Sequence, residues 1–145
     1  MLRSENNISL KVQVIVLSKD KSDTFVLQLK TNQERGLYWQ NITGNIEKNE
    51  FPIDAARREL LEETGLNSKY LVDLKTEHSF LDRWDRNIIE KSFVVLVPHT
   101  EKIKLSPEHA EFKWVNSKEI KQTSYKFQTN YESFLSALKY LDQCS

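Results

Sequence analysis

The sequence predicts a single α/β (mixed α+β) domain, in which helices cover a mixed sheet. Its 145 residues are close to the usual size of one domain. Apolar residues alternate in several short segments and recur at helical spacing in two longer ones. There is no repeat, low-complexity tract or linker, so we expect one domain over residues 1–145.

Three strands are expected before the first helix. Leu10–Leu17 and Thr24–Leu29 are rich in apolar residues, with partial alternation in the first. The polar segment Ser18–Asp23 between them indicates a hairpin turn. Tyr38–Thr43 is short and extended, and it ends at Gly44.

The first helix is expected over Pro52–Thr64. Proline suits the first helical turn, where its missing N–H has no helical partner to lose. Gly65 stands where a glycine commonly ends a helix. The helix therefore has a start signal and a stop signal at its two ends.

The second half of the chain predicts three more strands and a second helix. The strands are Tyr70–Phe80, Ile88–Val97 and Glu111–Val115. The helix covers Thr129–Leu141, with Thr129 and Glu132 as a capping box. The order β-β-β-α-β-β-β-α favours a mixed sheet with helices packed on it.

Composition excludes several classes of protein. Lys and Arg number 21 and Asp and Glu number 21, so the balanced charge argues against a general nucleic-acid binder. The longest apolar runs, such as Phe93–Val97, are too short to cross a membrane, and the N-terminus lacks the apolar core of a secretory signal. The single cysteine, Cys144, excludes an intramolecular disulfide. We therefore expect a cytoplasmic protein.

The first helix carries a cluster of acidic residues. Residues three and four apart share a helix face, so Glu59, Glu62 and Glu63 lie together. Arg58 can offset part of their repulsion through Glu62, four residues on. One interpretation is a solvated acidic face. The other is a site for Mg²⁺, which prefers carboxylate oxygens combined with substrate phosphates.

The spacing of these residues favours the metal site. Residues Gly44–Leu66 fit the pattern G-x5-E-x7-R-E-U-x-E-E-x-G-U at every fixed position, where U is aliphatic. This pattern is the Nudix box, and the chain resembles the Nudix hydrolases. The resemblance implies an α/β/α sandwich with a mixed sheet. It also implies hydrolysis of a nucleoside diphosphate linked to another moiety, with Mg²⁺ or Mn²⁺ as cofactor.

The resemblance assigns roles by position. Glu59, Glu62 and Glu63 would be metal ligands, joined by the carbonyl of Gly44. The residues that would orient these ligands are Arg58 and Glu50.

Two positions depart from the common family pattern. Asn49 replaces a frequent glycine, and asparagine tolerates the left-handed region better than most residues. Phe51 replaces a frequent Ser or Thr helix cap, so we expect the helix start to be adjusted and not lost.

Two further segments bear on the substrate. Trp39-Gln40-Asn41-Ile42-Thr43-Gly44 resembles the WQ-x-x-TG segment of dihydroneopterin triphosphate pyrophosphohydrolases. Pro98-His99, followed by Glu108-His109 and Lys113-Trp114, is similar to a second stretch of that subfamily, which dATP pyrophosphohydrolases share. The resemblance implies cleavage between the α and β phosphates, giving a monophosphate and pyrophosphate.

These likenesses suggest substrate contacts. Gln40 could hydrogen-bond a base or pterin edge, while Trp39 stacks on the ring or packs beneath it. The cations expected to meet phosphates are Lys30 and Arg35. The segment Asp82–Asn87 is either a substrate loop or a charged hairpin tip with an exposed aromatic.

An additional carboxylate is expected outside the box, and Glu108 is the candidate for a metal ligand or general base. The alternatives for this role are Glu77 and Glu90. The three histidines, His78, His99 and His109, show no paired metal spacing, which argues against zinc.

The sequence is also compatible with other functions. A dinucleoside polyphosphate or capped-RNA hydrolase would share the box and differ in the pocket, although neutral charge disfavours RNA. A non-catalytic ligand sensor often lacks box carboxylates, whereas this chain has the full set. The chain could act as a monomer or as a homodimer, the latter through its amphipathic last helix. We expect a small-molecule nucleotide or pterin triphosphate as partner, without membrane or nucleic acid.

Overall fold

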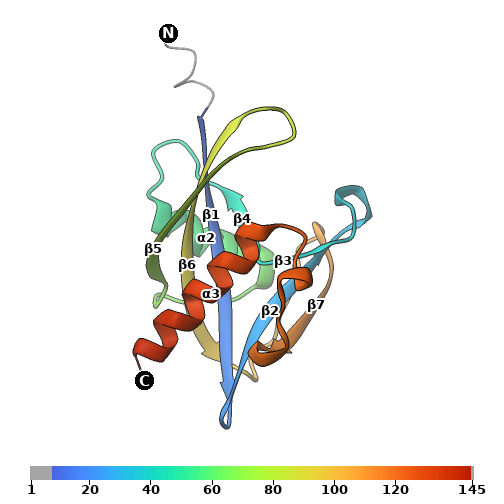
Figure 1. Cartoon of the computed structure of the whole chain (residues 1–145), viewed down its shortest axis with the longest axis vertical. Coiled ribbons are helices and arrows are strands. Elements are labelled where there is room, and N and C mark those ends of the chain that lie inside the picture. Colours follow the sequence, from blue (N-terminus) through green and yellow to red (C-terminus); the bar gives the residue numbers. More distant parts are fainter. Residues whose placement is uncertain (1–7, 145) are drawn as a thin grey trace.

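A mixed sheet of seven strands lies between helix α2 (Pro52–Thr64) and helix α3 (Gln128–Gln143) in the computed structural model, which describes residues 8–144 (Figure 1). The predicted mixed sheet and the α/β/α sandwich are confirmed. Neither helix of the described part is long and apolar enough to cross a membrane.

The sheet has the strand order β3-β2-β1-β6-β5, while β4 pairs with β1 and β7 pairs with β2. Strands β1 and β6 are parallel, and the other pairs are antiparallel. The bounds are β1 Ile8–Asp20, β2 Asp23–Thr31, β3 Trp39–Gln40, β4 Ile42–Asn45, β5 Val72–Leu81, β6 Asn87–Pro98 and β7 His109–Asn116. Short 3-10 helices span Gln33–Arg35, Ser117–Glu119 and Gln122–Ser124.

The sheet splits beyond the first hairpin. Strand β2 pairs with β1 only near the turn and then diverges from it together with β7 (Figure 1). The single strand predicted over 38–43 is therefore wrong, because the chain passes from β2 to β1 at Asn41 and forms β3 and β4. The buried Asn41 amide donates to Gln13 Oε1 at 2.8 Å, and its backbone N–H donates to Asn130 Oδ1 at 2.7 Å.

Two apolar clusters lie on the two faces of the sheet. Successive side chains of a strand point to opposite faces, so Val14 packs in the cluster beneath α2 while Ile15 packs in the one beneath α3. Leu60 contributes to the first cluster and Phe134 to the second, and both are fully buried. On the acidic side of α2, Glu62 stays half exposed, whereas Glu63 is itself buried.

The helix ends follow the predictions at α2 but not at α3. Pro52 begins α2, and Gly65 ends it with a φ of 75° and an N–H that donates to Leu61 O. The capping box predicted at Thr129 is wrong: Phe127 is the residue before α3, and it provides no side-chain cap. Helix α3 begins at Gln128, so Thr129 already lies in its first turn, and the Phe127 ring packs edge-on against Tyr38.

Candidate active site

Arg58, in the middle of α2, connects Glu50 before the helix with Glu59 and Glu62 in its second half. Its Nε and Nη2 donate to the two carboxylate oxygens of Glu50, at 2.9 and 3.0 Å. Its Nη1 donates to Glu59 at 2.9 Å and to Glu62 at 3.2 Å. The Arg58 guanidinium and the backbone N–H of Glu47 hold the pKa of Glu50 below its usual value. One guanidinium thus orients three carboxylates at once.

Helix α2 starts where the sequence departed from the family pattern. Asn49 has a φ of 65°, in the left-handed region that asparagine tolerates, as expected. Phe51 precedes the helix in an extended conformation without a side-chain cap, and Pro52 follows as the first helical residue. The expected adjustment of the helix start is confirmed.

Glu59 packs directly against the backbone of Gly44 in β4. A Cβ at Gly44 would lie 2.0 Å from Glu59 Cδ, so only glycine leaves room for this carboxylate. Burial, opposed in part by Arg58, raises the pKa of Glu59 to about 7, and the nearby charges of Glu62 and Glu63 add to the rise. The site therefore holds a carboxylate whose charge a cation would stabilise.

Glu63, one turn further along α2, is buried against a different set of partners. His109 Nδ1 at the start of β7 lies 2.7 Å from Glu63 Oε2, and Ser106 Oγ donates to Glu63 Oε1 at 3.0 Å. Burial alone would raise the pKa of Glu63, but His109 and Ser106 outweigh it and hold that pKa below its usual value. This carboxylate is thus kept charged by groups from outside the box.

Glu108 stands beside Glu63 at the same end of the site. Burial and the interaction with Glu63 raise the pKa of Glu108. Arg35 Nη2 donates to Glu108 Oε1 at 2.7 Å, and both side chains are about half exposed. The structure therefore brings Glu63, Glu108 and Arg35 together.

Trp39 and Gln40 occupy opposite faces of the short strand β3. Gln40 is buried, and its Nε2 lies 3.3 Å from His109 Nε2 on the side of Glu63. Trp39 faces the other way, with Lys113 Nζ 4.0 Å and Lys30 Nζ 5.9 Å from its ring centroid. Lys30 also forms an ion pair with Glu111 at 3.2 Å.

The alternatives to Glu108 have their partners elsewhere. Glu77 of the edge strand β5 pairs with Lys91 of the neighbouring strand β6. Glu90 is buried on the face that α3 covers, where Gln13 Nε2 donates to its Oε1 at 2.8 Å, and burial raises its pKa.

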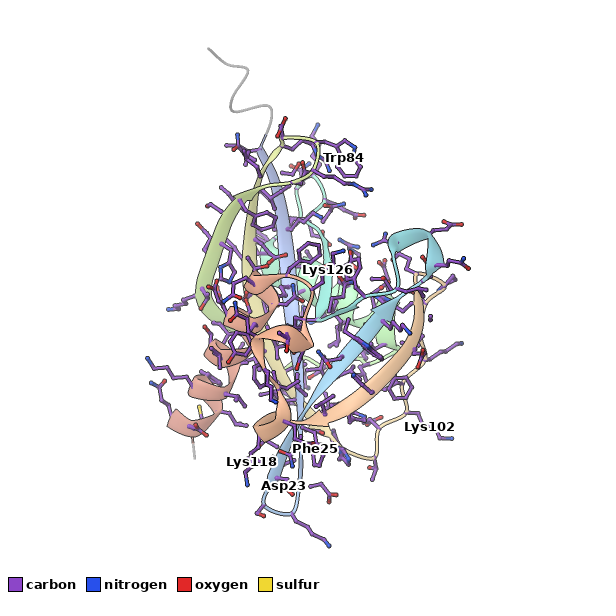
Figure 2. The ribbon with its side chains drawn as sticks, turned by 45° about the vertical axis from the view of Figure 1, so that its right-hand side comes forward. Asp23, Phe25, Trp84, Lys102, Lys118 and Lys126 are labelled. Carbon is purple, nitrogen blue, oxygen red and sulfur yellow. The ribbon has the colours of Figure 1, made fainter. Side chains whose placement is uncertain are left out.

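The tip of the β5–β6 hairpin carries an exposed aromatic ring between two cations. The guanidinium carbons of Arg83 and Arg86 lie 4.2 and 5.0 Å from the centroid of Trp84. Figure 2 shows Trp84 at the end of the molecule opposite to Asp23 and Phe25. Asp82 accepts from the side chain of Arg86 at 2.7 Å and from backbone N–H groups of the turn, which orders this tip.

The donor chemistry of the site fits a hard divalent cation. Glu59, Glu62 and Glu63 lie on one side of α2, and the open backbone of Gly44 adjoins Glu59. Within residues 8–144, no three His, Cys, Asp or Glu side chains group closely enough to hold a metal ion as they stand. Glu59 is turned toward Arg58 and Glu63 toward His109.

Sequence reasoning missed the partners of Glu63. It noted His109 in the subfamily likeness and weighed it against zinc but gave it no role, and it placed the start of the last strand at Glu111 and not at His109. It did not consider Ser106. The available signal was the Glu108-His109 pair, which the subfamily likeness had already singled out.

In this α/β/α sandwich, Arg58 holds the carboxylates of helix α2, and Glu59 of that helix packs against Gly44 in β4. The chain matches the NUDIX domain over residues 9–138. It therefore belongs to the Nudix family of hydrolases, which generally use divalent metal ions.

Individual relatives differ in how much of their length is matched. The chain is 38% identical over 108 residues to an octanoyltransferase of Myxococcus xanthus, covering 72% of this chain but only 30% of that protein. It is 29% identical over 154 residues to a dihydroneopterin triphosphate diphosphatase of Haemophilus influenzae, covering 92% of this chain and 88% of that one. A C. elegans Ap4A hydrolase complex shares the fold with a TM-score of 0.79, 15% identity, and coverage of 93% of this chain and 98% of that one.

Proposed function

We propose that this chain is a Mg²⁺-dependent pyrophosphohydrolase that cleaves a nucleoside triphosphate or pterin triphosphate between the α and β phosphates. The products would be a monophosphate and pyrophosphate. The observation that carries the proposal is the complete box, in which Arg58 orients Glu50, Glu59 and Glu62. Similarity to the Haemophilus diphosphatase over most of both chains supports the triphosphate class of substrate.

In this proposal the acidic face of α2 holds the cofactor. Glu59, Glu62 and Glu63, with the carbonyl of Gly44, would bind Mg²⁺, and Mn²⁺ is an alternative. The bound cation would neutralise phosphate charge and lower the pKa of water. Arg58 and Glu50 keep the ligand carboxylates in place.

Glu108 is the proposed general base. It lies next to Glu63 at the exposed rim of the site, and its pKa is raised by burial and by Glu63. A carboxylate with a raised pKa takes a proton from water more readily than an ordinary one. Arg35 Nη2 donates to this carboxylate, and we propose that Arg35 also contacts a substrate phosphate.

The proposed substrate contacts come from the loop and strands beside Glu108. Lys30 and Arg35 would neutralise phosphates, and Trp39 offers a ring for stacking beside Lys113. The buried amide of Gln40 is engaged by His109, which favours an indirect contribution from this residue.

A hydrolysis screen with purified protein and Mg²⁺ tests the proposal. It would contain dihydroneopterin triphosphate, the dNTPs and diadenosine tetraphosphate, with phosphate and pyrophosphate measured separately. We expect pyrophosphate from a triphosphate. Glu62→Gln should reduce turnover by about 100-fold or more without unfolding the protein, since Glu62 is half exposed. The exposed Glu119→Gln is the matched control.

Each negative result has a distinct meaning. Turnover of diadenosine tetraphosphate alone would replace the triphosphate substrate by a dinucleoside polyphosphate. Unchanged activity in Glu62→Gln would contradict the metal site on α2. Mg²⁺ binding without turnover of any compound would favour a ligand sensor.

A further inference from the structure

A buried line of polar side chains connects strand β3 to helix α2. It runs from the Gln40 amide to His109 and on to Glu63, through contacts of 3.3 Å at His109 Nε2 and 2.7 Å at His109 Nδ1. The side chains of His109 and Glu63 are 2% and 4% exposed, so water does not separate them. Three residues that are distant in the sequence thus form one contact chain.

The two contacts of His109 require a particular tautomer. A neutral imidazole has one protonated nitrogen and one acceptor nitrogen. Nδ1 is buried and makes no hydrogen bond that meets the geometric criteria, although Glu63 Oε2 lies only 2.7 Å from it. An unprotonated Nδ1 would face a carboxylate with its lone pair, which is repulsive. The proton therefore belongs on Nδ1, and in the neutral imidazole Nε2 is then the acceptor.

Gln40 supplies the donor that this tautomer needs. Its Nε2 carries two N–H groups and faces His109 Nε2. The reverse amide orientation would put a carbonyl oxygen against the acceptor nitrogen. The arrangement resembles metal sites in general, where a partner behind the ligand fixes its orientation.

We propose that His109 is a positioning residue for Glu63, and that Gln40 acts through His109 by selecting its Nδ1–H tautomer. The inference rests on the proposed function, because it treats Glu63 as a ligand of the catalytic metal. It gives Gln40 a role in the metal site and not in direct contact with the substrate. Because Gln40 lies on β3 and Glu63 on α2, the two contacts of His109 also connect this part of the sheet with the acidic helix.

The tautomer can be observed without any activity measurement. Long-range ¹H–¹⁵N spectra of the metal-free protein distinguish the two ring nitrogens of each histidine. We expect His109 to show a protonated Nδ1 and an unprotonated Nε2. In Gln40→Leu the preference for this state should weaken, with a change in the ring ¹⁵N shifts. A protonated Nε2 in the wild type would overturn the proposal.

Metal binding tests the positioning role directly. Titration with Mn²⁺ alone, followed by electron paramagnetic resonance, should show about tenfold weaker binding in His109→Ala. His109→Asn keeps an N–H near the position of Nδ1 and should recover most of the affinity, whereas His109→Gln extends past that position and should not. His99→Asn is the matched control, since His99 contacts Ser18 and not the acidic helix.

Kinetics separate positioning from packing. We expect kcat to fall in His109→Ala and Gln40→Leu with little change in KM, and rescue only in His109→Asn. Wild-type Mn²⁺ affinity in a folded His109→Ala protein would overturn the proposal, as would equal defects in the Asn and Gln variants. If His109→Ala fails to fold, the Asn, Gln and Gln40→Leu proteins decide.

The outcomes also separate this proposal from the proposed function. Intact Mn²⁺ binding and the expected tautomer, with no turnover of any triphosphate, would leave the positioning role standing and contradict the substrate. Failure of the wild type to bind Mn²⁺ or Mg²⁺ would overturn both proposals.

Discussion

The two ends of the acidic face of α2 hold their carboxylates in different ways. At one end, Glu59 is held by Arg58, its neighbour in the sequence, and packs on Gly44. At the other, Glu63 is held by His109 and Ser106, more than forty residues away. The pKa of Glu59 is raised to about 7, whereas that of Glu63 is lowered. Similar residues on one helix thus acquire opposite electrostatic behaviour from their partners.

We expect the largest loss of kcat when the packing of Glu59 against Gly44 is disturbed. Gly44→Ala places a Cβ 2.0 Å from Glu59 Cδ, so this carboxylate must move away. Because displacement of a catalytic group by about 1 Å can cost about 100-fold in rate, we expect a loss of that order in kcat. Steady-state kinetics with excess metal measure it, and circular dichroism checks the fold. Activity within threefold of wild type would show that Glu59 is not needed in this position.

We expect a smaller loss of kcat when Arg58 is replaced by lysine, which keeps the positive charge but not the planar guanidinium. Arg58→Lys loses the paired hydrogen bonds to Glu50 and the contact with Glu59. We expect kcat to fall by about 10- to 100-fold and stability by about 1–2 kcal/mol. Arg57→Lys, on the same helix and paired with Asp54, serves as control. Equal behaviour of the two variants would contradict the orienting role of Arg58.

The opposite pKa shifts predict opposite effects of pH on the metal-free protein. Between its unfolded value of 4.5 and its folded value of about 7, Glu59 keeps a proton in the folded state that the unfolded chain has lost. Its contribution is therefore present below pH 4.5 and is lost as pH rises through 7. Glu63 has a lowered pKa, so its contribution is present above 4.5 and is lost as pH falls below that value.

Urea unfolding at pH 5 and pH 8 measures the Glu59 effect. Glu59→Gln should be more stable than wild type at pH 8, by up to about 3 kcal/mol, and similar to wild type at pH 5. Chelator in the buffer keeps the protein free of metal. A constant difference between the two proteins at both pH values would show that Glu59 does not titrate in this range.

The smallest effect is expected at the Glu63 end when only one of its partners is removed. Ser106→Ala deletes the hydrogen bond to Glu63 Oε1 but leaves His109 in place. We expect a loss of about 1 kcal/mol in stability and a few-fold drop in kcat. Thermal unfolding and kinetics provide the measurements. A loss as large as that in Gly44→Ala would mean that Ser106, and not His109, is the main partner of Glu63.

The sequence predicted the fold class and most elements because apolar periodicity is a local property. It also predicted both ends of α2, since Pro52 and Gly65 act on the backbone where they stand. It failed at residues 38–43, where the divergence of β2 from β1 divides one apparent strand into two. It failed again at Thr129, which lies inside α3 because the helix already begins at Gln128. At residues 38–43, long-range strand pairing overrode the local signal.

The acidic face of α2, its arginine partner and the two ends of the helix could all be predicted from local sequence. Helical spacing of three and four residues brings Glu59, Glu62 and Glu63 together whatever surrounds them. The contacts of Glu63 with His109, and of His109 with Gln40, could not be read from the sequence. They join residues of α2, β7 and β3 that are far apart in the chain, so they depend on the folded arrangement of these elements and not on any local pattern.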